Sequence, residues 1–79
     1  MTVRLPNFDD VVSASRRLAA HAVVTPLIGH PRLDAATGGR VLLKPESLQR
    51  IGAFKFRGAY NAIVQVEKDA FPGGVVACS

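Results

Sequence analysis

The chain has 79 residues, of which 48% are hydrophobic and 20% charged, and its formal net charge is +4. This apolar composition excludes the weakly hydrophobic, highly charged class of disordered proteins, and the length suits one small domain or a piece of a larger one. The ten basic residues are scattered and form no run, so the charge predicts no nucleic-acid partner.

The N-terminal sequence MTVRLPNFDD lacks the basic region and apolar run of a signal peptide. No apolar stretch approaches the roughly 20 residues that span a bilayer, which predicts no membrane partner. Cys78 is the single cysteine, which excludes an internal disulfide and fits a reducing compartment. We therefore expect a soluble, cytoplasmic protein.

The first predicted element is an amphipathic helix over residues 7–22. Asn7 suits the N-cap, and Asp9 and Asp10 fall in the first turn, where the helix dipole favours negative charge. Arg16 and Arg17 are expected on the solvent side. The apolar stripe of this helix consists of Phe8, Val11, Val12, Leu18, Ala19 and Ala22.

An irregular stretch follows, because Pro26 disfavours helix at the preceding residue and several glycines and prolines come after it. One helical turn is predicted at about residues 33–36. Residues 40–44, RVLLK, then read as a short strand that ends at Pro45. Three consecutive apolar residues in this strand predict burial on both faces of a parallel or mixed sheet.

The second half of the chain predicts a loop over residues 45–53, a helix from residue 54 to about residue 69 and a buried strand over residues 75–79. The order helix–strand–helix–strand indicates an α/β protein with an open parallel or mixed sheet and a right-handed crossover. The last strand leads toward the kind of loop in which α/β proteins bind ligands. We therefore expect an incomplete fold.

Lys55 stands between Phe54 and Phe56 in the sequence IGAFKFRGAYN. A position in the first helical turn and two neighbouring rings would both disfavour the charged ammonium, and a neutral amine can form a Schiff base with an aldehyde. The alternative is that Phe54 is an ordinary core residue and that Lys55 reaches solvent along its flexible stem. The residue pattern leaves both interpretations open.

Three motifs in this order carry a resemblance: Thr25-Pro26-Leu27, then LKPESLQ at residues 43–49, then GAFKFRGA at residues 52–59. Together they resemble the N-terminal region of the threonine dehydratase and serine racemase family of pyridoxal-phosphate enzymes, from about residue 10 to residue 79. The resemblance implies a fold type II pyridoxal-phosphate enzyme. It implies that residues 1–79 are a truncated N-terminal segment with no complete domain.

The resemblance also assigns residue roles. Lys55 would carry pyridoxal phosphate covalently and later move the α-proton of an amino-acid substrate, and Phe54 would pack beside the cofactor. Ser79 would begin a Ser-Ser-Gly-Asn-His loop near the substrate carboxylate. The implied activity is a dehydratase or ammonia-lyase reaction on a hydroxy amino acid of the threonine or serine type, in a homo-oligomer when the protein is full length. No metal ligand is implied, and Arg57 and Glu46 are assigned to structure.

Two positions depart from the family pattern. Ile51 stands where members commonly have threonine, and Ala53 where many have serine. The phosphate-binding glycine-rich loop of the family has no counterpart in these residues. The alternative function is therefore a non-catalytic fragment or a module that folds against a partner, and the 79-residue chain alone is expected to be inactive.

Overall fold

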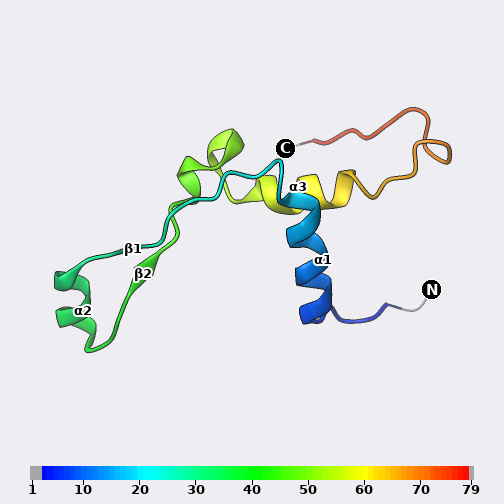
Figure 1. The fold of residues 1–79 in the computed structure, drawn as a ribbon. Helices are drawn as coiled ribbons and strands as arrows, with labels where there is room; N and C mark the ends of the chain where they lie inside the picture. Colours follow the sequence, from blue (N-terminus) through cyan, green and yellow to red (C-terminus); the bar gives the residue numbers. More distant parts are fainter. Residues whose placement is uncertain (1–2, 79) are drawn as a thin grey trace. The chain divides into compact units, whose positions relative to one another are not determined.

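The computed structural model describes residues 3–78, which contain three helices, two short strands and two 3₁₀ turns (Figure 1). The chain divides into two compact units. One runs up to His21 and resumes at Arg57, and the other is Ala22–Phe56. The second boundary between the units, after Phe56, falls within the third helix.

Helix α1 spans Phe8–Leu18 and begins as predicted. The side chain of Asn7 accepts a hydrogen bond from the backbone of Asp10 at 3.1 Å, and the Asp10 carboxylate accepts one from the Asn7 backbone at 2.8 Å. This reciprocal capping box satisfies two amide groups that the helix itself leaves without partners. The Arg4 guanidinium adds two hydrogen bonds to the same carboxylate, at 2.6 and 2.7 Å.

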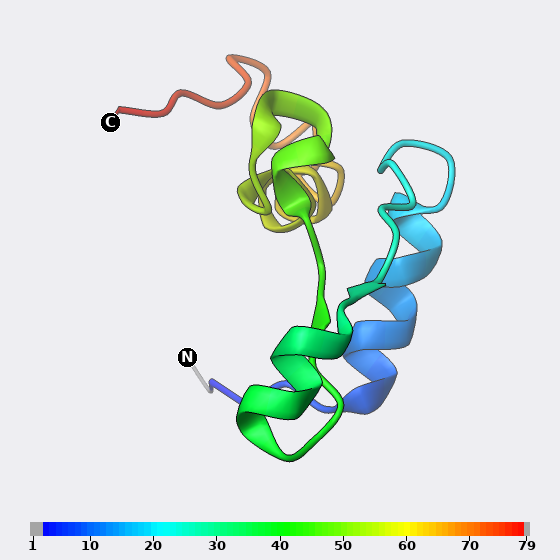
Figure 2. The ribbon, with the colours of Figure 1, turned by 90° about the vertical axis from the view of Figure 1, so that its left-hand side faces the viewer.

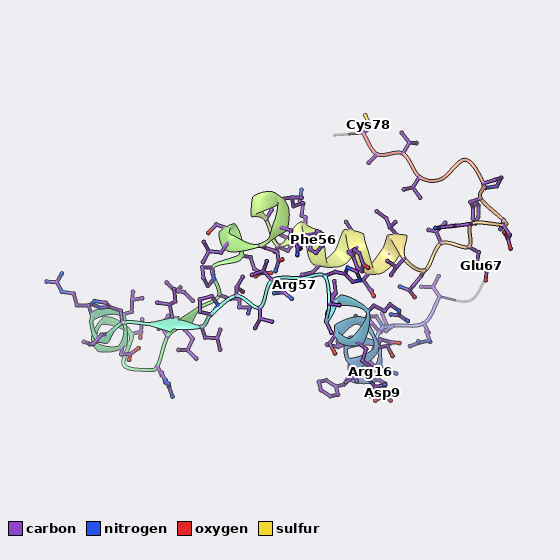
Figure 3. All side chains as sticks on the ribbon, turned by 45° about the horizontal axis from the view of Figure 1, so that its top comes forward. Asp9, Arg16, Phe56, Arg57, Glu67 and Cys78 are labelled. Carbon is purple, nitrogen blue, oxygen red and sulfur yellow. The ribbon has the colours of Figure 1, made fainter. Side chains whose placement is uncertain are left out.

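The predicted length of α1 was wrong at its end, because the helix stops four residues earlier than residue 22. The His21 amide donates to the Leu18 carbonyl at 2.9 Å, which tightens the chain into a turn. Leu18 is buried, whereas Phe8 at the other end of the apolar stripe is 76% exposed. Arg16 and Arg17 are exposed as predicted, and Arg17 also donates to Asn61 Oδ1 at 3.1 Å. Figure 3 shows Asp9 and Arg16 projecting from α1.

Strand β1 (Ile28–Gly29) pairs with strand β2 (Leu42–Leu43) in an antiparallel ladder, with Ile28 opposite Leu43 and Gly29 opposite Leu42. Helix α2, Pro31–Thr37, connects the two strands and lies at the far end of this hairpin-like segment (Figure 2). Its seven residues exceed the single turn predicted.

Local capping explains the length of α2. His30 Nδ1 accepts from the Arg32 amide at 3.1 Å, and Pro31 occupies the first helical position. Gly38 ends the helix with a φ of 73°, a conformation that glycine adopts without strain. Asp34 Oδ1 then accepts from the Val41 amide at 2.9 Å, which directs the chain into β2.

The observed pairing of β2 is antiparallel, and the predicted parallel or mixed sheet is not confirmed within residues 3–78. Both residues of β2 are exposed, so the prediction that this strand is buried on both faces is wrong. Within residues 3–78 the segment 75–78 forms no strand, although one was predicted there. A strand requires a neighbour to receive its hydrogen bonds, and the described residues supply none to this segment.

Helix α3 spans Lys55–Ile63 and is shorter than predicted. After it the amides of Gln65 and Val66 donate to carbonyls only three residues back, at 3.2 and 3.1 Å. The sequence Ile63-Val64-Gln65-Val66 is rich in β-branched residues, which lose side-chain freedom in a helix and favour such an ending. The His21 and Tyr60 rings lie 4.5 Å apart and join this helix to the turn that follows α1.

Candidate cofactor-anchoring site

The site prediction centres on Lys55, and the unit Ala22–Phe56 holds the residues that lead into it. Between β2 and α3 lie two 3₁₀ turns, η1 at Glu46–Leu48 and η2 at Arg50–Gly52. Turn η1 lies within the second sequence motif, and η2 ends at Gly52, the first residue of the third. The buried polar side chains of Thr25 and Gln49 contact this segment.

Thr25 links the first motif to the second. Its hydroxyl donates to Glu46 Oε2 at 2.7 Å, and its carbonyl accepts from Lys44 Nζ at 2.7 Å. Only 3% of Thr25 is exposed. A polar group so far from water requires such partners, because leaving one of them unpaired costs about 1–3 kcal/mol. The interaction of Glu46 agrees with the structural role that the sequence assigned to it.

Gln49 is the second buried polar residue of this unit, at 4% exposure. Its Nε2 donates to the Val23 carbonyl at 2.9 Å, and its Oε1 accepts from the Val23 amide at 2.8 Å. The same Oε1 also accepts from the Arg50 amide at 3.0 Å. Gln49 thus ties the loop before Lys55 to Val23, which lies 26 positions earlier in an irregular segment.

The chain reverses directly after Gln49. Ile51 has φ 60° and ψ 4°, and Gly52 has φ 70°, so two successive residues adopt left-handed conformations. Within residues 3–78, Ile51 is the single non-glycine residue with positive φ. The Gly52 amide donates to the Gln49 carbonyl at 2.9 Å, which closes the turn. Ala53 returns to extended geometry and leads into α3.

Lys55 is the first residue of α3, so the prediction that it lies in the first helical turn is confirmed. Its side chain is exposed, Phe54 is 67% exposed and Phe56 is half-buried. Of the two interpretations that the sequence left open, this exposure favours the one in which Lys55 reaches solvent along its stem. Successive helical residues point about 100° apart, so adjacent rings do not face the side chain between them. Figure 3 marks Phe56 and Arg57 at this end of the helix.

Phe54 directly precedes Lys55, the first residue of α3. Ser79, the third predicted site residue, lies outside the described residues. Sequence reasoning treated Gln49 as an unremarked loop residue and missed its anchoring role. The local sequence offered no signal for this role, because the partner of Gln49, Val23, lies 26 positions away.

No group of three or more histidine, cysteine, aspartate or glutamate side chains within residues 3–78 could hold a metal ion. None of the helices described here combines the length and the apolar character that crossing a bilayer requires.

The comparisons with known proteins place these features in one family. The model of the pyridoxal-phosphate dependent enzyme family matches residues 10–79. An L-threo-3-hydroxyaspartate ammonia-lyase of Pseudomonas sp is 44% identical over 77 residues, which cover 98% of this chain and 24% of that protein. A biosynthetic L-threonine dehydratase of Mycobacterium tuberculosis is 43% identical over 70 residues, covering 89% of this chain and 16% of that one.

A serine racemase of Schizosaccharomyces pombe is 40% identical over 75 residues, which cover 95% of this chain and 23% of that enzyme. The chain thus spans about a quarter or less of the length of these relatives. No solved structure matches it significantly. The family match over residues 10–79, supported by relatives that align with nearly the whole chain, shows that this chain belongs to the pyridoxal-phosphate dependent enzymes.

Proposed function

We propose that the intact protein is a pyridoxal-phosphate-dependent ammonia-lyase that acts on a small hydroxy amino acid of the threonine or serine type. The observation that carries this proposal is the accessible amine of Lys55 at the start of α3, directly after a turn that buried hydrogen bonds hold. The similarity to enzymes named as a hydroxyaspartate ammonia-lyase and a threonine dehydratase supports the reaction class.

The residues present fit the attachment of this cofactor. An aldehyde reacts with a primary amine that solvent can reach, and the Lys55 side chain is exposed. Phe54, the preceding residue in the chain, has an exposed ring that offers an apolar surface for a flat heteroaromatic group. Phosphate recognition is assigned to no residue of this chain.

Each proposed role uses a group of this chain. Lys55 would hold the cofactor through its amine, and the same amine would remove the proton from the substrate α-carbon. Phe54 would pack beside the cofactor ring, and Ser79 would contact the substrate carboxylate. The bound cofactor supplies an electron sink that stabilises the negative charge developing at that carbon.

The proposed reaction neither consumes nor releases water overall. The α-proton and the β-hydroxyl leave the substrate as one molecule of water, and a second molecule of water hydrolyses the dehydrated amino acid to a 2-oxo acid and ammonia. No external oxidant or reductant is required. The proposed setting is the cytoplasm, in a homo-oligomer whose partner is a small-molecule amino acid.

Substitution of Lys55 tests this function in the intact protein. Lys55→Ala should abolish the visible absorption band of the covalently held cofactor and lower the turnover of threonine or serine by at least about 10²–10⁴-fold, because no amine remains at that position. Lys68→Ala is the matched control, since Lys68 is an exposed lysine in a turn beyond α3, and it should retain both properties. A Lys55→Ala protein with both the band and the turnover would disprove the assignment.

A further inference from the structure

We infer that Gln49 is a positioning residue that sets the reactive geometry of Lys55 by clamping the Ile51–Gly52 turn. This inference rests on the proposed role of Lys55, but the residues and contacts that carry it are independent of the cofactor. The hydrogen bonds of the Gln49 side chain go to the backbone of Val23 and Arg50, so Gln49 acts through the backbone that leads to Lys55.

The first support is that Gln49 holds the turn from both sides. Its side-chain oxygen accepts from the amide of Arg50, and its backbone carbonyl accepts from the amide of Gly52. Ile51, between these two tethered residues, is the one with the unfavourable positive φ. The clamp therefore acts on the position that would otherwise relax.

The second support is that the clamp has a fixed anchor. The Gln49 amide group exchanges two hydrogen bonds with the backbone of Val23, at 2.8 and 2.9 Å, and its buried location excludes competing water. A flexible surface glutamine could not impose a backbone conformation. This one is held in a single orientation by three hydrogen bonds.

The third support is the short distance along the chain from the turn to the amine. Only Ala53 and Phe54 separate Gly52 from Lys55, and Ala53 is extended. A rotation of the backbone at Ile51 would therefore redirect the first turn of α3 and its lysine. Thr25, by contrast, forms an equally buried hydrogen bond to Glu46 that does not involve the turn.

The experiment compares Gln49→Met with Thr25→Val in the intact protein. Each variant removes buried hydrogen bonds while nearly preserving side-chain size. The readout is the rate at which pyridoxal phosphate followed by borohydride labels Lys55, relative to Lys68, in protein first freed of its cofactor. Mass spectrometry maps the label, and circular dichroism checks that the protein is folded. Gln49→Met should lower the relative labelling of Lys55 by about tenfold or more, and Thr25→Val should leave it within about twofold. Equal effects of the two variants would overturn the inference.

A double variant separates positioning from general stability. Glycine adopts positive φ without strain, so Ile51→Gly should need no clamp. Adding Ile51→Gly to Gln49→Met should recover most of the labelling of Lys55, and adding it to Thr25→Val should change nothing. An additive result, without recovery in the Gln49→Met background, would count against the clamp.

Kinetics and amide exchange complete the test. Gln49→Met should lower kcat and leave KM within about twofold, because Lys55 moves a proton in the chemical step.

If Gln49→Met does not fold, hydrogen exchange of the unaltered protein tests the inference. With the clamp in place, the Arg50 and Gly52 amides should exchange as slowly as the Val23 amide. Fast exchange at Arg50 and Gly52 would refute the clamp. Loss of the proposed function would instead appear as a cofactor band that survives Lys55→Ala.

Discussion

The backbone of Ile51 is strained. Its φ of 60° lies in the left-handed region, which β-branched side chains rarely enter, and such a conformation costs of order 1–3 kcal/mol. The side chain is 75% exposed, so burial of its methyl groups offsets little of that strain. The conformation persists because hydrogen bonds on both sides of the residue hold it.

Replacing Ile51 with asparagine should stabilise the protein. Asparagine enters the left-handed region more readily than a β-branched residue, so Ile51→Asn should raise the free energy of unfolding by roughly 0.5–1 kcal/mol. Denaturant unfolding of the intact protein measures this difference. Val24→Asn is the control at an exposed residue without positive φ, and it should change the stability by no more than about 0.5 kcal/mol. A destabilised Ile51→Asn protein would contradict the strain at this position.

The sequence predicted where two of the helices begin, but it predicted neither the strand pairing nor where the helices end. The starts of α1 and α3 followed from short-range signals, such as Asn7 with Asp10 and the apolar period that begins at Phe54. The sheet did not, because strand pairing depends on residues distant in sequence, and the antiparallel partner of Leu42–Leu43 lies beyond α2. The helix ends were missed because turns only three residues long replaced the last helical hydrogen bonds.

The same distinction applies to the site. Lys55 stood out because its neighbours Phe54 and Phe56 are adjacent in sequence, and its place at the helix start was predictable from local pattern. Gln49 could not be recognised in this way, since its partner Val23 is 26 residues away and both contacts use backbone groups that every residue has. Exposure of Phe54 was also unpredictable, because it depends on which other residues reach that ring.

The N-terminus of α1 should titrate as a unit. Two hydrogen bonds from Arg4, with a further one from the Asn7 backbone, lower the pKa of Asp10 from 3.8 to about 2. Because the pKa is lower in the folded state, the stabilisation of α1 is complete above about pH 4 and is lost as the pH falls toward about 2. Salt should weaken the effect, since the Arg4–Asp10 ion pair is solvent-accessible.

Nuclear magnetic resonance titration of the Asp10 carboxyl carbon measures this pKa directly. Arg4→Ala should raise the pKa toward its ordinary value, and Asp10→Asn should remove the helix loss between about pH 4 and pH 2. Asp9→Asn is the control in the same helical turn and should leave that loss in place. An Asp10 that titrates near 3.8 in the unaltered protein would show that the capping box and ion pair do not form.

At the scale of the whole chain, little apolar surface is covered. Among residues 3–78 the buried residues are Leu18, Thr25 and Gln49, and two of these three are polar. Large apolar side chains, including Phe8, Phe54 and Phe71, remain exposed in both units. Exposed apolar surface on this scale is typical of a surface that other protein covers. It agrees with a chain that spans about a quarter or less of its relatives' length.

A peptide of these 79 residues alone should therefore lack lyase activity and bind pyridoxal phosphate without selectivity. Holding a phosphate usually requires several backbone amides that converge on it, and the proposed function assigns that task to no residue of this chain. Lys55 is then one accessible amine among three lysines, each able to form a reversible imine with an aldehyde. Treatment with pyridoxal phosphate and borohydride should label Lys44, Lys55 and Lys68 to similar extents, with Lys44 slowest because it donates to Thr25. Labelling confined to Lys55, with release of a 2-oxo acid from threonine or serine, would show instead that the segment is itself a working enzyme.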